Sequence, residues 1–568
     1  MKMDVLEIKN KKYIVIAMIS FFAVACMFVL TRSLEYKLLI FSLLSLSAVL
    51  SGFAQKEADT NPKLLSLLII SLCQLLILIF EMYYFESKGI YATVSMILEF
   101  TLYCTVMLVY YGSLIQNWQP EKLFLIIILP YGLFMTLCLP VKTAPDERTH
   151  IYTSYRISNV LLKNETVATN GDFSIREKDQ EYLYLPIEFE NSIDLMNSIY
   201  SSSLFVDNEE TVLLENSECL NGNEVAYILS AVGISIGRIL GLNAFWALTL
   251  GRLFNLLQYT ACIYFAIKVM PYSKYVPLSV ALLPIAIQQG MSYSYDSLVI
   301  ALSIFVICGS LGYKYNSRVE YKKNKLLGVI VGGASVVLFF LKKHSYMFIA
   351  LSSIVVLLSD NVYFEKFSKL AVKTMLVGIC LFMGYTIINT VFHLGPYFKE
   401  PINPISWQNG VQGYTIQYFL NEPLDLIIVY IRTMVRFLPF YICSATSYDL
   451  GWLNIQIAPV FILVFIVLCL LSTQYESLVK INKLEKQYYI LSSVFTVIAI
   501  VMALLISWTP KGVGVSLGVQ GRYFIPLLVP VLLLLPNGEK IFQKSQNYFP
   551  VMYSLAIMVF SVFLITRF

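Results

Sequence analysis

Charged residues are scarce in this chain of 568 residues: they make up 14%, against 58% that are hydrophobic. A soluble globular protein carries about a quarter charged residues, so the shortage excludes an ordinary water-soluble fold and indicates that lipid surrounds most of the chain. The net charge of +5 is small for this length and neither indicates nor excludes a nucleic-acid partner. We expect no such partner, and one large bundle of spanning helices instead of several soluble domains.

Further absences exclude particular kinds of site. There is no P-loop and no glycine-rich dinucleotide motif, which disfavours a nucleotide-sugar donor bound on a soluble domain. Of the ten cysteines only Cys219 lies in a long polar loop, so no disulfide framework is expected. The three histidines, His150, His344 and His393, have a spacing unlike any metal signature. The first apolar run lacks a small-residue cleavage site, so we interpret it as a span with a basic cytoplasmic flank.

Long apolar runs are what the sequence has in abundance. Before residue 141 they lie at about 13–31, 36–53, 64–84, 90–112 and 122–140. After residue 224 they lie near 225–242, 244–269, 276–291, 297–313, 326–341, 345–359, 370–394, 425–443, 453–472, 488–508, 522–536 and 550–567. Basic residues favour the cytoplasmic side, and this tendency is met best if 225–242 and 425–443 lie at the interface without crossing. The predicted fold is an all-α polytopic integral membrane protein with about 15 transmembrane helices.

The polar loop 141–224 is predicted to lie outside the cytoplasm. It holds 16 acidic residues and 6 basic ones, the reverse of a cytoplasmic loop, and five crossings separate it from the lysine-rich N-terminus. The same topology places Asp296, the cluster Lys342-Lys343-His344 and Arg522 on that outer face. Polar groups from distant parts of the chain are therefore expected to meet there.

The segment Pro145-Asp146-Glu147-Arg148-Thr149-His150 is the strongest candidate for chemistry. It brings two carboxylates, a guanidinium and an imidazole together where the chain leaves the membrane. The apolar residues after it recur at helical spacing, which predicts a short amphipathic helix on the membrane surface. A carboxylate at a helix start is also an ordinary N-terminal cap, so the residues alone leave a capping and a catalytic role open.

Other charged residues have a structural alternative as well. Asp296 is either an N-cap of the following span or a second acid of the site. Lys342 and Lys343 are either interfacial lysines whose stems lie along apolar surface or contacts to a phosphate. Arg252 lies within the span 244–269, where an arginine usually pairs, and we name Asp296 or Glu147 as its partner.

Two further arginines are explained equally well by a membrane-surface anchor and by a donor-binding site. Arg432 and Arg436 are four residues apart and therefore share one helical face. Glu99 lies within the span 90–112, where a charge is costly, and the sequence assigns it no role.

Four motifs carry a resemblance to a known family. APDERTH, MSYSYDSLVIALS, LKKHSYMFIAL and VQGRYFIPLLVPVLLLL occur in the order found in the bacterial membrane-protein family catalogued as domain of unknown function 2142. The similarity covers roughly 125–540. That family in turn resembles the GT-C glycosyltransferases, which take sugars from polyprenyl-phosphate donors. The resemblance implies a GT-C-like core over 121–395 and a C-terminal part over 396–568 with an outer loop, an interfacial helix and further spans. Residues 1–120 hold extra helices of unknown role.

The resemblance implies an inverting membrane transferase at the outer face of the bacterial plasma membrane. Its donor would be a polyprenyl-phosphate-linked sugar and its acceptor a surface polysaccharide or glycolipid. Asp146 would be the base, with Glu147 as a second carboxylate or metal ligand. Substrate-binding roles are expected for the basic and polar residues near it: Arg148, His150, Arg252, Asp296, Lys343, Arg436 and Arg522. No cofactor follows with certainty, and a divalent cation is left open.

A transporter or flippase for a lipid-linked glycan is the alternative function. Such a protein would line a path through the bilayer with charges and would show inverted repeats. Glu99 and Arg252 lie inside spans, but the two halves show no evident repeat and the remaining charges gather at one face. This pattern favours chemistry at a surface over passage through the bilayer.

Overall fold

The computed structural model describes most of the chain from residue 89 to 567. Its principal gaps are 164–171, 186–191, 207–209, 216–218, 316–320, most of 359–376, 393–400, 476–480 and 536–546. The spans predicted at 13–31, 36–53 and 64–84 lie outside the described residues, as does part of 370–394.

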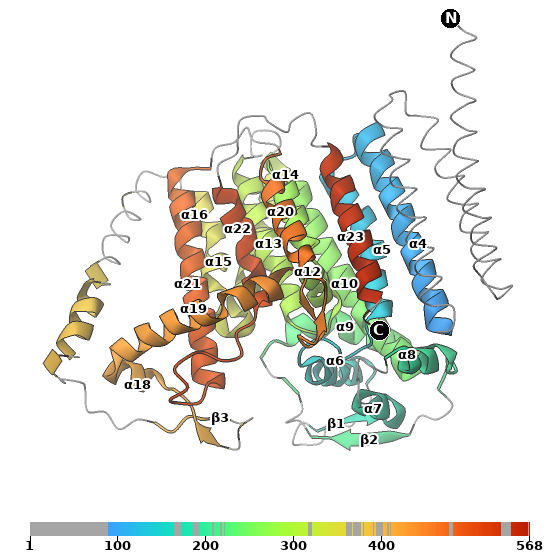
Figure 1. Ribbon diagram of the computed structural model, residues 1–568, viewed down its shortest axis with the longest axis horizontal. Coiled ribbons are helices and arrows are strands. Elements are labelled where there is room, and N and C mark those ends of the chain that lie inside the picture. Colours follow the sequence, from blue (N-terminus) through green and yellow to red (C-terminus); the bar gives the residue numbers. More distant parts are fainter. Residues whose placement is uncertain are drawn as a thin grey trace, which may run out of the picture.

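A bundle of upright helices forms the body of the molecule (Figure 1). Its longer members are α4 (Ile90–Tyr110), α5 (Pro120–Cys138), α10 (Ala244–Val269), α13 (Asp296–Tyr315), α14 (Tyr321–Phe340), α20 (Val460–Ser472), α21 (Lys483–Trp508), α22 (Ile525–Leu534) and α23 (Phe549–Ile565). Helix α4 continues as one turn of π-helix over Tyr111–Ile115. Asn482 and Glu485 form a capping box at the start of α21.

Five helices among the described residues are long and apolar enough to cross a membrane. They are Ile90–Ile115, Pro120–Cys138, Asp296–Tyr315, Pro423–Thr446 and Lys483–Trp508. Shorter apolar helices accompany them, including α20, α22 and α23. The chain is therefore a mostly helical membrane protein, while the predicted number of about 15 crossings stays a prediction.

Two predicted apolar runs do not form single straight spans. The run 225–242 forms α9 (Ile228–Ile239), which has 12 residues and is too short to cross. The run 276–291 breaks into α11 (Tyr275–Ala281) and α12 (Pro284–Met291), and every residue of both is buried. Pro284 opens α12, a position where its missing N–H costs nothing. Helix α12 ends at Met291, shortly before Asp296 opens α13.

Helix α19 (Pro423–Thr446) differs from the upright helices. It satisfies the length and hydropathy of a span, but little of it is buried, and Figure 1 shows it steeply inclined to the rest of the bundle. Its C-terminal end packs on η7 (Gly521–Phe524), where the Gly521 N–H donates to Ser444 Oγ at 2.9 Å. A Cβ at residue 521 would collide with the backbone of Tyr441 and Ala445, so glycine is required at this close approach.

The loop after α5 folds into a cap at the lower end of the bundle in Figure 1. It contains α6 (Glu147–Leu161), β1 (Phe173–Arg176), α7 (Glu177–Tyr184), α8 (Ser192–Ser201), β2 (Thr211–Leu214) and η4 (Glu224–Tyr227). Strands β1 and β2 pair antiparallel, with Phe173 opposite Leu214. The remaining short elements are η5 (Leu341–His344), α15 (Met347–Ala350), α16 (Ser352–Leu358), α18 (Ile416–Asn421) and the two-residue pairs β3–β4 (Pro404–Ile405, Val411–Gln412) and β5–β6 (Asp449–Leu450, Ile455–Gln456).

Helix α6 forms where a short helix was predicted, but its polar side is covered by protein. The Ser154 hydroxyl lies 2.8 Å from that of Ser230 on α9, and the Ser158 hydroxyl lies 2.9 Å from that of Ser235 on the same helix. Small hydroxyl-bearing residues let the two helices approach closely and satisfy each other's hydrogen bonds. The helix thus packs the cap against α9, and its expected place at the membrane surface stays a prediction.

Candidate functional site

Asp146 marks the junction between α5 and α6. Its backbone is left-handed, with φ 57° and ψ 14°, a conformation that few residues other than glycine adopt. Its side chain makes no capping hydrogen bond to the helix that follows. The side chain is exposed although Pro145 and Glu147 on either side are buried. The capping explanation therefore fails, and the turn presents this carboxylate outward.

Glu147 points the other way, into the bundle. Its Oε2 lies 2.5 Å from Nη2 of Arg252, and Nε of Arg252 donates to its Oε1 at 2.9 Å; both side chains are completely buried. Arg252 also donates to the carbonyls of Leu139 and Pro140 at 2.7 and 3.0 Å. The predicted pairing of Arg252 is thus with Glu147, not with Asp296. The pair fastens the α5–α6 turn to α10, so it holds Asp146 in place and leaves Glu147 no free oxygen facing solvent.

A second charged cluster forms around Asp296 at the start of α13. Lys342 Nζ of η5 lies 2.7 Å from its Oδ1, and Arg522 Nε of η7 lies 3.2 Å from its Oδ2. The Arg522 contact is an ion pair without hydrogen-bond geometry, so within the described part of the chain Nε of this buried guanidinium has no hydrogen-bond acceptor. Residues far apart in sequence therefore meet, and one buried donor remains available.

Tyrosine rings enclose the Lys342 ammonium. Its Nζ lies 3.5 Å from the ring centroid of Tyr523, 5.4 Å from that of Tyr295 and 5.9 Å from that of Tyr346. An ammonium over aromatic faces is stabilised by the ring quadrupole. The Tyr346 hydroxyl donates to the carbonyl of Tyr523 at 2.9 Å, which ties η5 to η7.

His150 links this cluster to the cap. Its Nδ1 lies 2.7 Å from the Tyr227 hydroxyl, and its ring meets that of Tyr295 edge-on at 5.2 Å. Burial lowers the pKa of His150 to about 3; Asp296 opposes this, and the Arg522 and Lys342 cations reinforce it. The imidazole is therefore neutral at physiological pH and acts as a hydrogen-bonding partner without charge.

Asp146 lies beside the same cluster. Although its side chain reaches solvent, much of its surroundings is protein, and this burial raises its pKa above the ordinary aspartate value. The Asp296 carboxylate raises the pKa further, and the Arg522 guanidinium lowers it. A carboxylate with a raised pKa that remains accessible is suited to accept a proton.

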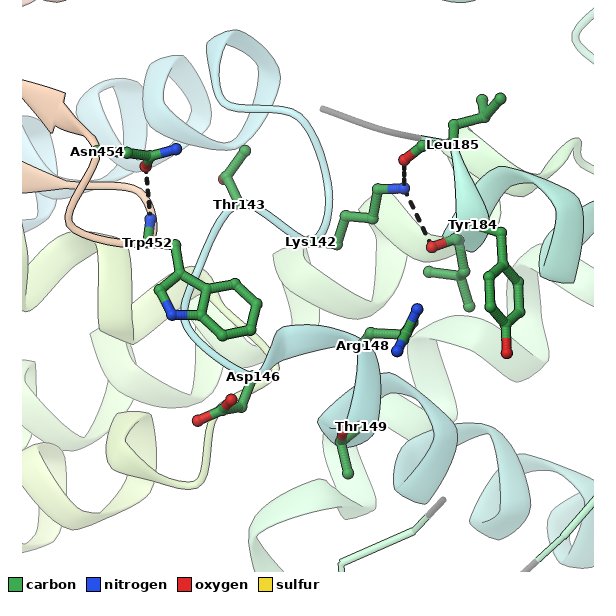
Figure 2. A pocket seen from close by; sticks show the side chains of 10 residues that line it. Lys142, Thr143, Asp146, Arg148, Thr149, Tyr184, Leu185, Trp452 and Asn454 are labelled. Carbon is green, nitrogen blue, oxygen red and sulfur yellow. Dashed lines mark hydrogen bonds between the residues drawn. The ribbon is translucent and has the colours of Figure 1, made fainter. Parts of the chain in front are cut away.

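A cavity of about 380 Å³ opens next to Asp146. Figure 2 shows Asp146, Arg148, Trp452 and Tyr184 facing it from three segments of the chain. Its remaining lining residues are Lys142, Thr143, Thr149, Leu183, Leu185 and Asn454. The cavity is large enough for a sugar-sized ligand, and it brings the loop after α5, α7 and the turn between β5 and β6 together.

Several other polar residues that the sequence singled out lie away from the charged cluster or are not described by the structure. Arg436 is exposed on α19 and lies 5.5 Å from the ring of its neighbour Phe437. The side chain of Lys343 is outside what the structure describes, and so is His393. His344 is exposed and contacts the Phe339 carbonyl at 2.9 Å. The substrate-binding roles predicted for Lys343 and Arg436 stay predictions.

Sequence reasoning missed two residues that the cavity and the cluster contain. Lys342 contacts Asp296, whereas the prediction favoured its neighbour Lys343. Trp452 lines the cavity from the β5–β6 hairpin, and it lies just before the predicted apolar run 453–472, which overlaps the second strand of that hairpin. Adjacent lysines carry no signal that distinguishes them, and a single tryptophan at the edge of an apolar run reads as an interfacial anchor.

No group of three or more histidine, cysteine, aspartate or glutamate side chains comes together as a metal site within the described part of the chain. Both oxygens of Asp296 contact cationic side chains. The oxygens of Glu147 contact Arg252 in the same way. Glu147 thus contacts Arg252 inside the bundle, and its role as a second carboxylate or metal ligand stays a prediction.

Fold and site together define a polytopic helical membrane protein with charged side chains gathered at one end of its bundle. The chain belongs to the family described as "Predicted membrane protein (DUF2142)", whose model matches residues 129–531. The resemblance carried by the four sequence motifs is thereby confirmed. No curated protein and no solved structure matches the chain.

Proposed function

We propose that the protein is a membrane glycosyltransferase of the GT-C type. It moves a sugar from a polyprenyl-phosphate donor to a surface polysaccharide or glycolipid. The observation that carries this proposal is that Asp146 lies accessible at a cavity and next to the buried cluster of Asp296, Lys342 and Arg522. An acid with cationic groups beside it matches what transfer from a lipid phosphate requires.

The proposed step is a single displacement at the anomeric carbon. A hydroxyl oxygen of the acceptor forms the new bond to that carbon, and the bond between the carbon and the donor phosphate oxygen breaks. The acceptor proton goes to the Asp146 carboxylate, and the electron pair of the broken bond remains on the polyprenyl phosphate. General-base assistance of this kind contributes roughly 10²–10⁴-fold in rate.

Arg522 and Lys342 are the proposed partners of the leaving phosphate. Among the described residues the buried Nε of Arg522 has no hydrogen-bond acceptor, although it lies 3.2 Å from Asp296 Oδ2. A guanidinium can bind phosphate with two parallel hydrogen bonds. Asp296 holds both cations before the donor arrives, which offsets part of their burial cost. When the donor phosphate approaches, it shares these cations with Asp296.

The charge distribution supports an extracytoplasmic site. Asp296 opens α13, and Lys314 near its other end, about 30 Å away, pairs with Glu485 at 2.8 Å. Lys483 and Lys486 flank Glu485 at the start of α21. Lys274 pairs with Glu121 at the start of α5, the end of that helix away from the Asp146 loop. Because basic residues favour the cytoplasm, the Asp146 end would face outward across a bacterial plasma membrane.

The purified protein tests this proposal in a nanodisc with a polyprenyl-phosphate sugar and a glycan acceptor. The expected result is release of free polyprenyl phosphate together with a new glycosidic bond, both abolished by Asp146→Asn. Asp194→Asn, the same change at an exposed position on α8, is the matched control and retains activity. Movement of an intact lipid-linked glycan across a vesicle membrane, without release of the carrier, would support a flippase instead.

A further inference from the structure

Two half-exposed aromatic rings face the cavity beside Asp146 from different segments. Trp452 is 54% exposed and Tyr184 is 53% exposed, although both line the same hollow (Figure 2). Exposed aromatic rings that share a cavity with polar and charged side chains are suited to bind a polar ligand. The apolar face of a pyranose ring packs against such a ring, while its hydroxyls remain free for hydrogen bonds.

The turn that carries Trp452 is held firmly. Gln288 of α12 exchanges two hydrogen bonds of 3.1 Å with the backbone N–H and carbonyl of Gly451. The backbone N–H of Trp452 donates to Asn454 Oδ1 at 2.9 Å. The next residue, Leu453, has φ 64°, a costly backbone conformation for a bulky residue. Strained backbone of this kind is kept where the surrounding structure enforces it, often at functional sites. The tryptophan is thus presented by a fixed turn.

Arg148 is the cation in the cavity that keeps free donors. Within the ranges that the structure describes it makes no hydrogen bond and no ion pair, and it stacks 5.0 Å from the Tyr184 ring centroid. Lys142 differs, because its ammonium donates to the carbonyls of Tyr182, Leu183 and Leu185. Arg148 is therefore oriented by an aromatic ring with its hydrogen-bonding groups available.

We propose that this cavity binds an acidic sugar unit of the acceptor glycan. Its ring lies against Trp452 and Tyr184, and its anionic group is held by Arg148. The inference rests on the proposed function, since the bound glycan is taken to be the acceptor. Arg148 lines the open cavity, whereas Arg522 and Lys342 lie buried around Asp296. Acceptor anion and donor phosphate therefore have separate cations. Asp146 lines the same cavity as Arg148 and interacts electrostatically with Arg522.

The test measures binding alone, so it does not depend on transfer. Purified protein in nanodiscs, without donor, is titrated calorimetrically with three probes: tetragalacturonate, its carboxyl-reduced neutral analogue, and a glycerol-phosphate oligomer that has charge but no sugar ring. Tetragalacturonate should bind at least about tenfold more tightly than either of the other two, because it alone satisfies both the rings and the guanidinium.

The variants separate the two contacts. Arg148→Gln should weaken tetragalacturonate binding about tenfold or more and leave the neutral analogue unchanged, and Arg148→Lys should fall between because an ammonium lacks the bidentate fork. Trp452→Ala should weaken both sugar probes. Asp146→Asn should still bind tetragalacturonate. A wild-type protein that binds tetragalacturonate but transfers no sugar to any acceptor would count against the proposed function and not against this site.

Several results would overturn the inference. Equal affinity for the charged and neutral sugars, or an Arg148→Gln protein that binds tetragalacturonate like the wild type, removes the role of Arg148. Tight binding of the glycerol-phosphate oligomer removes the role of the rings. Fluorescence that is lost in Trp452→Phe and quenched by brominated phospholipid would place Trp452 in the bilayer and would likewise end the proposal.

Discussion

Replacing Glu147 by glutamine should destabilise the protein by about 3–5 kcal/mol, the usual cost of breaking a buried ion pair by removing one partner. Glu147 and Arg252 are completely buried, and two hydrogen bonds join them. The substitution leaves the Arg252 guanidinium charged and surrounded by protein. Backbone N–H groups of Ala144 and Tyr293, each 3.3 Å from a Glu147 oxygen, also lose a charged acceptor.

The free energy of unfolding is measured by detergent-induced unfolding in mixed micelles, followed by tryptophan fluorescence. Glu181→Gln on α7 is the control, because its partner Lys178 is exposed and such pairs contribute little. The double variant Glu147→Gln with Arg252→Met should be less destabilised than the sum of the two single variants, because no lone charge remains. A Glu147→Gln protein within about 0.5 kcal/mol of the wild type would refute the role assigned to this pair.

Three further predictions concern the charged cluster. The transfer rate should fall as pH drops through the pKa of Asp146, because only the ionised carboxylate can accept the acceptor proton. Since that pKa is raised, the fall should begin at a higher pH than for an ordinary aspartate. A rate profile that is flat down to pH 4 would contradict this. Folding stability should be lost progressively as pH falls from about 6.5 towards 3, because the unfolded chain protonates His150 at a higher pH than the folded protein does. The midpoint of thermal unfolding should therefore depend less on pH in His150→Gln than in the wild type. Arg522→Lys should lower the turnover number by about 10²–10³-fold, as loss of a transition-state donor does, and a change confined to the Michaelis constant would argue against a leaving-group role.

Much of the architecture could be predicted because hydropathy reports on lipid exposure directly. The runs 90–112, 122–140, 244–269 and 297–313 correspond to α4, α5, α10 and α13 within a few residues. Charge asymmetry also predicted that Asp146, Asp296 and Arg522 would share one end of the bundle, and the structure brings them together. The net charge of a whole loop indicates on which side of the membrane the loop lies, so this prediction holds even where single helix boundaries are wrong by a few residues.

Features that depend on side-chain packing could not be predicted in the same way. Hydropathy does not separate two short helices from one long one, so the break between α11 and α12 at Leu283 was invisible. The choice of Lys342 over Lys343 depends on which lysine η5 turns towards Asp296. Trp452 faces the cavity because Gln288, more than 160 residues away, fixes its turn. Such long-range contacts leave no trace in local pattern.

The central claim is that a donor phosphate binds beside Asp146, at Arg522 and Lys342. A cryo-EM structure of the Asp146→Asn protein with polyprenyl phosphate tests this most directly. The account predicts phosphate density within hydrogen-bonding distance of the Arg522 guanidinium and the Lys342 ammonium, on the side that faces the cavity. Phosphate density at another face of the bundle, with the Asp296 cluster unchanged, would contradict it.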